Sequence, residues 1–100
     1  MRTILSASAV IMLALAVPAV AQGQGYYAAV PATPAVGKKL VTRDTIWRCG
    51  DSGCGAPKSA TRPAILCELL VREVGSLQSF SVAGTAFDAD ALARCNAGAE

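Results

Sequence analysis

Four cysteines, Cys49, Cys54, Cys67 and Cys95, are the residues of this 100-residue chain whose type and spacing point to chemistry. A zinc site is disfavoured because the chain has no histidine and its cysteines do not form two close pairs. A thiol–disulfide enzyme typically has two cysteines separated by two residues at a helix start, whereas four residues separate Cys49 from Cys54. The pattern favours two structural disulfides, and no metal or cofactor is expected.

Four cysteines allow three pairings. Cys49 and Cys54 would face each other across a hairpin turn, which leaves Cys67 to pair with Cys95. In the chain-entropy model the short loop contributes about 2 kcal/mol and the long loop about 3.5 kcal/mol to stability. We therefore expect the second bridge to be the more important one.

The turn sequence Gly50-Asp51-Ser52-Gly53 resembles the residues around the nucleophile of chymotrypsin-like serine proteases. A serine nucleophile needs a base, usually a histidine, and this chain has none. The chain is also too short for the two barrels of that protease fold. We therefore interpret the motif as a turn, predict no catalytic residue and expect the protein not to be an enzyme.

The first 21 residues have the pattern of a secretory signal peptide. A positive start at Arg2 precedes an apolar run over 4–17, and an Ala-x-Ala site ends at Ala21. The run is shorter than the roughly 20 residues that cross a bilayer, so no stable membrane anchor is expected after cleavage. This predicts a periplasmic or secreted protein. Without Arg2, eight Lys and Arg face seven Asp and Glu, a balance that does not suggest nucleic-acid binding.

Residues 22–39 are expected to form a flexible Ala/Pro/Gly tether. The segment contains Pro31 and Pro34 and shows no hydrophobic period, so it is not expected to bury enough surface to fold. Tyr26 and Tyr27 are interpreted as solvated linker residues.

The folded domain is predicted over 40–97. A strand is expected over Val41–Cys49, and the chain returns through the turn into a short strand over 55–57. Alternating polar and apolar residues predict one further strand over 79–83.

Two helices complete the domain. The first is expected over 61–74, with Thr61 as N-cap, Pro63 in the first turn and Gly75 as the stop. Its apolar stripe consists of Leu66, Cys67, Leu70, Val71 and Val74. Asp88 is expected to cap a second helix that ends near Asn96. The predicted fold is a small α+β domain stapled by disulfides, with a hairpin, one further strand and two helices on one face.

Charge is distributed unevenly along the mature chain. Residues 38–62 contain six basic and two acidic side chains. With Trp47 beside Arg48, this half could contact an anionic envelope polymer, a lipid headgroup or an acidic protein surface. The competing interpretation is that Trp47, the only tryptophan, belongs to a small core and that scattered charges maintain solubility.

The cysteine pattern also carries a family resemblance. Its elements are Trp47-x-Cys49-x4-Cys54-x-Ala56-Pro57-Lys58, then Pro63-Ala64-x2-Cys67-x2-Leu70-x-Arg72-Glu73-Val74-Gly75-x-Leu77-x2-Phe80, and finally Leu92-Ala93-x-Cys95-Asn96. Over 41–97 the chain resembles a family of short, uncharacterised secreted proteins from alphaproteobacteria. The resemblance implies a signal peptide, a variable tether and a four-cysteine domain, without an assigned activity or ligand.

These observations favour a non-enzymatic periplasmic or secreted interaction or envelope-associated protein. Its expected partner is an envelope protein or an anionic envelope polymer. One alternative is a thiol–disulfide redox protein that uses Cys49 and Cys54, because a small exposed hairpin bridge can be reducible. Another is an inhibitor of an envelope enzyme.

Overall fold

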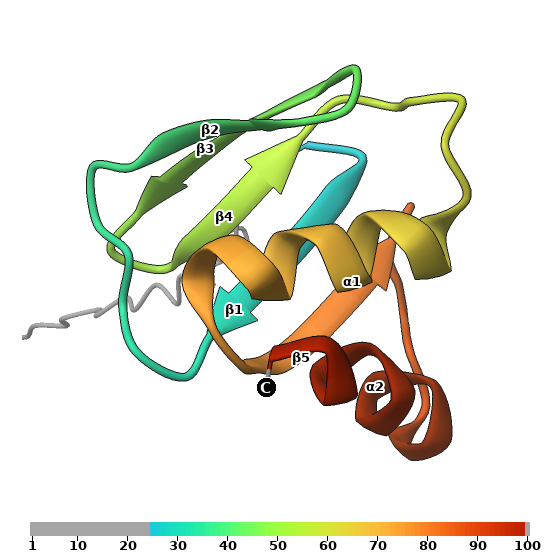
Figure 1. Ribbon diagram of the computed structural model, residues 1–100. Helices are drawn as coiled ribbons and strands as arrows, with labels where there is room; N and C mark the ends of the chain where they lie inside the picture. The colour runs from blue at the N-terminus through green and yellow to red at the C-terminus, as the bar shows by residue number, and fades with distance from the viewer. Residues whose placement is uncertain (1–24, 100) are drawn as a thin grey trace, which may run out of the picture.

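The chain forms a six-stranded antiparallel sheet with two helices packed on one face (Figure 1). The computed structural model describes residues 25–99, so the predicted signal peptide lies outside the described part of the chain. In chain order the elements are β1 (Tyr27–Pro31), β2 (Lys39–Thr42), β3 (Thr45–Gly50), β4 (Gly53–Ala56), α1 (Pro63–Val74), β5 (Leu77–Val82), β6 (Thr85–Ala86), α2 (Ala89–Asn96) and the 3-10 helix η2 (Ala97–Ala99). The predicted α+β class is confirmed, although the sheet has more strands than expected.

Strand β1 lies in the middle of the sheet, whose order is β2-β3-β4-β1-β5-β6. It pairs antiparallel with β4 on one side and with β5 on the other. The expectation of a flexible tether over 22–39 therefore does not hold for residues 27–31. The sequence Tyr-Ala-Ala-Val-Pro shows no polar alternation, and it forms a strand because its neighbours supply hydrogen bonds on both edges. Pro31 is tolerated at the strand end, where the register with β5 shifts.

Tyr27 is a core residue, contrary to its interpretation as a solvated linker residue. Its side chain is 2% exposed and packs beside Trp47 and Phe80, with ring centroids 6.1 and 6.3 Å away. Its hydroxyl donates to the carbonyl of Ser59 at 3.2 Å and accepts from the Ser59 amide at 3.3 Å. Tyr26 is half-buried against the Tyr27 ring at 4.9 Å.

The segment expected as one strand over 41–49 is instead a hairpin of β2 and β3. The chain turns at Arg43 and Asp44, and Thr42 pairs with Thr45. Arg43 has a φ of 59°, a left-handed conformation that residues other than glycine adopt at a cost. The turn lacks the Asn-Gly or Asp-Gly signal of a tight hairpin, so the sequence pattern did not indicate it.

The second hairpin, β3–β4, is the predicted one. Cys49 lies directly opposite Cys54 in the register, and the two form a disulfide on the helix side of the sheet. Gly53 has a φ of 140°, and a Cβ there would lie 2.5 Å from the carbonyl oxygen of Ala29 in β1. Glycine therefore allows β4 to approach β1 closely.

Helix α1 connects β4 to β5 across β1. It begins at Pro63 with Arg62 as N-cap, so the prediction of Thr61 as N-cap is wrong. The helix ends as predicted at Gly75, whose φ of 89° suits a C-cap glycine. The predicted apolar stripe is confirmed: Leu66, Cys67, Leu70 and Val71 are buried, and Val74 is partly buried against the core.

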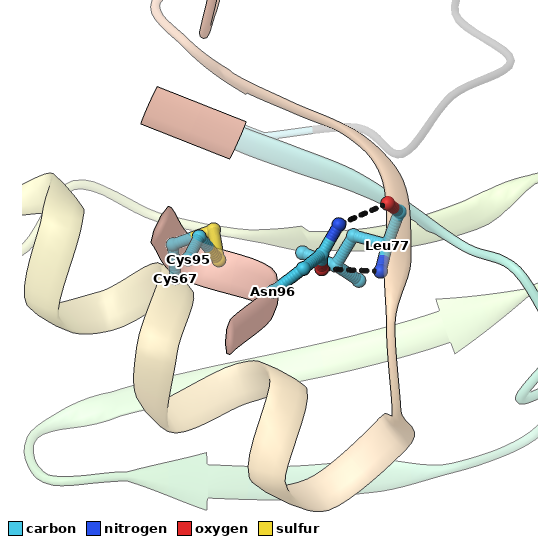
Figure 2. Close-up of a disulfide and its surroundings, with 4 residues drawn as sticks. All are labelled: Cys67, Leu77, Cys95 and Asn96. Atoms are coloured by element: carbon cyan, nitrogen blue, oxygen red, sulfur yellow. Dashed lines mark hydrogen bonds between the residues drawn. A yellow bond between two sulfur atoms is a disulfide. The ribbon is translucent and has the colours of Figure 1, made fainter. Parts of the chain in front are cut away.

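Helix α2 is held to the rest of the domain at its C-terminal end (Figure 2). The predicted N-cap is confirmed, since the Asp88 carboxylate accepts from the Ala91 amide at 2.8 Å. Cys95 forms the predicted disulfide with Cys67 of α1. Asn96 accepts from the Leu77 amide at 2.8 Å and donates to the Leu77 carbonyl at 2.9 Å. This side-chain amide satisfies both backbone groups of the first residue of β5.

We expect the two disulfides to contribute unequally to stability. In the chain-entropy model, replacing Cys67 and Cys95 together by alanine lowers the free energy of unfolding by about 3.5 kcal/mol, and replacing Cys49 and Cys54 lowers it by about 2 kcal/mol. Urea unfolding of the two double variants measures both values. A larger loss for the Cys49/Cys54 variant would contradict the loop-length account.

The position of β1 in the sheet gives a second prediction. Tyr27→Ala is expected to destabilise the domain by about 3–5 kcal/mol, as for other buried aromatic residues. Tyr27→Phe should cost about 1 kcal/mol because it removes only the hydroxyl contacts with Ser59. Tyr26→Ala, at the half-buried neighbour, is the control and should cost less than Tyr27→Ala. Equal and negligible losses at both tyrosines in urea unfolding would show that the segment does not pack as described.

Candidate functional site

The structure places the two predicted interaction residues, Trp47 and Arg48, on opposite faces of the sheet. Trp47 is fully buried on the helix side, and its indole N–H donates to the hydroxyl of Thr42 at 2.9 Å. Arg48 is exposed on the other face. Neighbouring residues of a strand always point to opposite faces, so the pair cannot share a binding surface. Trp47 is a core residue, and Arg48 remains as a candidate contact.

Arg48 belongs to a group of four outward side chains on the β2–β3 hairpin, which we call the hairpin face. Its members are Lys39, Val41, Ile46 and Arg48. All four are exposed, with Val41 and Ile46 exposed to 60% and 44%. The register pairs Lys39 with Arg48 and Val41 with Ile46 across the two strands. The face therefore consists of one basic pair next to one apolar pair.

Lys39 and Arg48 are the only charged residues in the six described strands, and they lie directly opposite each other. Like charges in directly opposed positions destabilise a sheet. No strand of the described chain contains Asp or Glu to offset this repulsion. The basic pair is thus unfavourable for the isolated fold and favourable for an anionic group that lies over it.

The part of this sheet face that adjoins Arg48 carries small side chains. Next to Arg48 the register continues through Gly55, Ala28 and Ser81 into β4, β1 and β5. Both helices lie on the other face of the sheet (Figure 1). A partner that contacts the hairpin face would therefore meet little obstruction from side chains of the adjoining strands.

The other residues considered for chemistry, in the Cys49–Cys54 bridge and the turn between them, have structural roles. Cys49 is 7% exposed and Cys54 is fully buried, so the bridge presents little sulfur surface to an attacking thiol. The predicted turn over 50–53 is present but shorter: Gly50 and Gly53 pair in the strands, and Asp51 and Ser52 form a two-residue turn between β3 and β4. Within residues 25–99, no group of three or more Cys, Asp or Glu side chains is arranged to hold a metal ion. No helix in the same range is long and apolar enough to cross a membrane.

Asp44, at the tip of the hairpin, accepts three hydroxyl hydrogen bonds on one carboxylate oxygen. Ser59 and Thr45 donate at 3.1 Å, and Thr61 donates at 3.3 Å. These bonds hold the pKa of Asp44 below its ordinary value of 3.8, and the bond from Ser59 has the largest effect. The cluster ties the loop before α1 to the hairpin turn. Thr61 does not cap the helix because it lies one residue before the N-cap Arg62.

A small hollow of about 130 Å³ lies between the two helices. It is lined by Ala64, Glu68, Phe87, Ala91, Arg94 and Cys95. Such a volume is small compared with pockets that enclose a ligand. Its position beside the Cys67–Cys95 bridge fits helix packing better than ligand binding.

Sequence reasoning missed three members of the hairpin face, Lys39, Val41 and Ile46. The basic run and the β-branched residues were visible, but the turn at Arg43 that pairs them was not predicted. Because successive side chains of a strand point to opposite faces, the sequence alone could have assigned Trp47 and Arg48 to different faces of the sheet.

Together, the fold and the hairpin face define a small disulfide-bonded α+β domain with one sheet face that neither helix of residues 25–99 covers. The chain belongs to a family of unknown function, DUF8200, whose family model matches residues 10–97. This match covers the segment that carries the resemblance described above. No curated protein and no solved structure gives a significant match.

The Asp44 cluster predicts a dependence of stability on pH. Because its pKa is lowered in the folded state, the stability it provides is fully present above its ordinary value of 3.8 and is lost as the pH falls through the folded value. Ser59→Ala removes the leading cause and should raise the pKa of Asp44, as measured by NMR titration of its carboxyl carbon. Ser79→Ala, on β5, is the control and should leave it unchanged. An unaltered titration in Ser59→Ala would contradict this origin of the shift.

Proposed function

We propose that this protein is a non-enzymatic periplasmic or secreted interaction domain whose hairpin face binds an anionic partner. The observation that carries the proposal is the opposed pair Lys39–Arg48, which contributes the only charges in the described strands. An acidic group that bridges the two side chains replaces their mutual repulsion with two attractions. The adjacent pair Val41–Ile46 adds apolar contact area to the same surface.

The alternative explanation for Lys39 is protection of the sheet edge against aggregation. That role needs one charge on the edge strand β2. It does not require a second positive charge directly opposite on β3, where repulsion lowers stability. It also does not explain why Val41 and Ile46 are exposed beside the charges. Binding of an anionic partner accounts for both pairs.

Export is part of the proposal. The pattern of residues 1–21 favours a signal peptide with cleavage after Ala21. Two disulfides suit an oxidising compartment. The resemblance to short secreted proteins of alphaproteobacteria supports the same location. In that compartment an acidic envelope protein, including an envelope enzyme that the domain inhibits, is a partner of suitable chemistry.

The chain also lacks what an enzyme of the considered classes would need. It has no histidine to serve as a base for Ser52. The Cys49–Cys54 bridge is almost fully buried, whereas a redox enzyme would need an accessible sulfur atom. These observations favour binding over catalysis.

Charge reversal at Lys39 tests the proposal. Lys39→Glu should raise the free energy of unfolding by about 0.2–1 kcal/mol, because it replaces a repulsive cross-strand pair with an attractive one. The same variant should retain several-fold less material when the immobilised, oxidised domain is exposed to a solubilised envelope fraction. Stability is measured by urea unfolding and retention by quantitative mass spectrometry.

Arg72→Glu is the matched control. It makes the same change in net charge on α1, at an exposed position away from the hairpin face. It should leave the retained material unchanged. Equal retention by Lys39→Glu and the unmodified domain would show that the hairpin face is not the contact surface.

A further inference from the structure

The hairpin face adjoins a strand edge that offers backbone hydrogen bonds. β2 is the first strand in the sheet order, and no strand among residues 25–99 pairs with its outer side. The opposite edge strand, β6, contains only Thr85 and Ala86. Since edge strands expose unpaired N–H and C=O groups, β2 is the longer of the two positions where another chain could add.

The register identifies which residues of β2 present these groups. In an antiparallel pair, every second residue bonds to the neighbouring strand and the residues between them turn their N–H and C=O outward. The two-residue turn makes Thr42 and Thr45 the closing hydrogen-bonded pair. Counting back from Thr42, Lys39 and Val41 direct their backbone groups toward the open edge.

Hydrogen bonds at the other end of the hairpin give the same alternation. The amide of Cys49 donates to the Lys38 carbonyl at 2.9 Å, and its carbonyl accepts from the Gly37 amide at 2.9 Å. Cys49 is four residues after Thr45, so both direct their backbone groups toward β2, as the alternation requires. The assignment of outward groups to Lys39 and Val41 therefore does not depend on the turn alone.

We propose that the partner is an acidic, extended protein segment that adds to β2 as an antiparallel strand. This inference rests on the proposed function and narrows its partner to a polypeptide. Directly paired residues share a face of the sheet, so the residue opposite Val41 would be apolar. In the antiparallel direction, the residue opposite Lys39 comes two positions later and would be Asp or Glu. The recognised pattern is apolar-x-acidic.

The position of the charges supports this pattern. An acidic side chain opposite Lys39 would extend the row Lys39–Arg48 and place a negative charge next to two positive ones. An apolar side chain opposite Val41 would extend the row Val41–Ile46. The added strand would thus continue both rows of the hairpin face, while its backbone takes up the free groups of β2.

The same charges disfavour a second copy of this chain as the added strand. Residues 38–48 contain Lys38, Lys39, Arg43 and Arg48 but only one acidic residue, Asp44. Two such hairpins placed edge to edge would repel each other. An acidic segment would instead be attracted to these basic residues. Charge therefore favours a strand from a different protein over a second copy of this chain.

Three synthetic peptides test the inference on the intact, oxidised protein without its signal peptide. The first is acetyl-Thr-Val-Thr-Glu-Thr-amide, which carries the pattern. The second exchanges Val and Glu and has the same composition and charge. The third keeps the first sequence but carries N-methyl groups on the Val and Glu amides, which would otherwise donate to β2. Affinity is measured by NMR titration, and hydrogen exchange reports the protection of individual amides.

The first peptide should bind and protect the amides of Lys39 and Val41. The N-methylated peptide should bind at least about tenfold more weakly, because it lacks the backbone donors. The exchanged peptide should also bind more weakly. Val41→Pro should abolish binding by removing an edge donor, whereas Val41→Thr keeps that donor and should retain the amide protection. If Val41→Pro does not fold, the N-methylated peptide still tests on the unmodified protein whether binding needs backbone hydrogen bonds.

Equal affinity for the first and third peptides, or protection that appears elsewhere, would overturn strand addition. Vesicles containing phosphatidylglycerol separate this failure from failure of the proposed function. If the vesicles bind the unmodified protein but not Lys39→Glu, while the peptides do not bind, strand addition is wrong and an anionic partner for the hairpin face stands. If binding of the peptides, the vesicles and the envelope fraction is the same for Lys39→Glu as for the unmodified protein, both proposals are overturned.

Discussion

The pairing of β1 with strands on both of its sides is the constraint on which the rest of the fold depends. Because β1 is antiparallel to β4 and to β5, those two strands run parallel to each other and cannot be joined by a tight turn. The chain must cross β1, and α1 makes this crossing. Its position over the sheet brings Cys67 close enough to Cys95 to form a disulfide. It also lets the Asn96 side chain accept a hydrogen bond from the amide of Leu77, the first residue of β5. Without β1, the strands β2-β3-β4 and β5-β6 would no longer belong to one sheet.

The two faces of the sheet differ for a physical reason. On the inner face, Tyr27, Trp47 and Phe80 form a triangle of rings 6.1 to 6.3 Å apart beneath the helices. A domain of this size has a small core, so these aromatic residues and the two disulfides are concentrated on that side. Next to the hairpin, the outer face carries the small residues Gly55, Ala28 and Ser81. The only charged residues of the described strands lie where the sheet is also open at its edge.

The predictions from sequence were most successful where a local signal was strong. Helix α1 and the Asp88 cap of α2 followed from spacing, and the disulfide pairing followed from a turn between Cys49 and Cys54. They were unsuccessful where the signal was not local. The strand at residues 27–31 is apolar throughout, and the hairpin turn at Arg43 has no turn-forming glycine. Of the two predicted interaction residues, Trp47 belongs to the core, because Trp47 and Arg48 point to opposite faces of the strand.

The sequence by itself determined the helices, the cysteine pairs and the class of the fold, because these depend on residues close together in the chain or on a single choice among few pairings. Only the tertiary structure decided that β1 is central and that Lys39 opposes Arg48. Strand pairing joins residues far apart in the chain, and each pairing depends on the neighbours that supply its hydrogen bonds. A charge at residue 39 and another at 48 therefore became one surface only when the hairpin register brought them together.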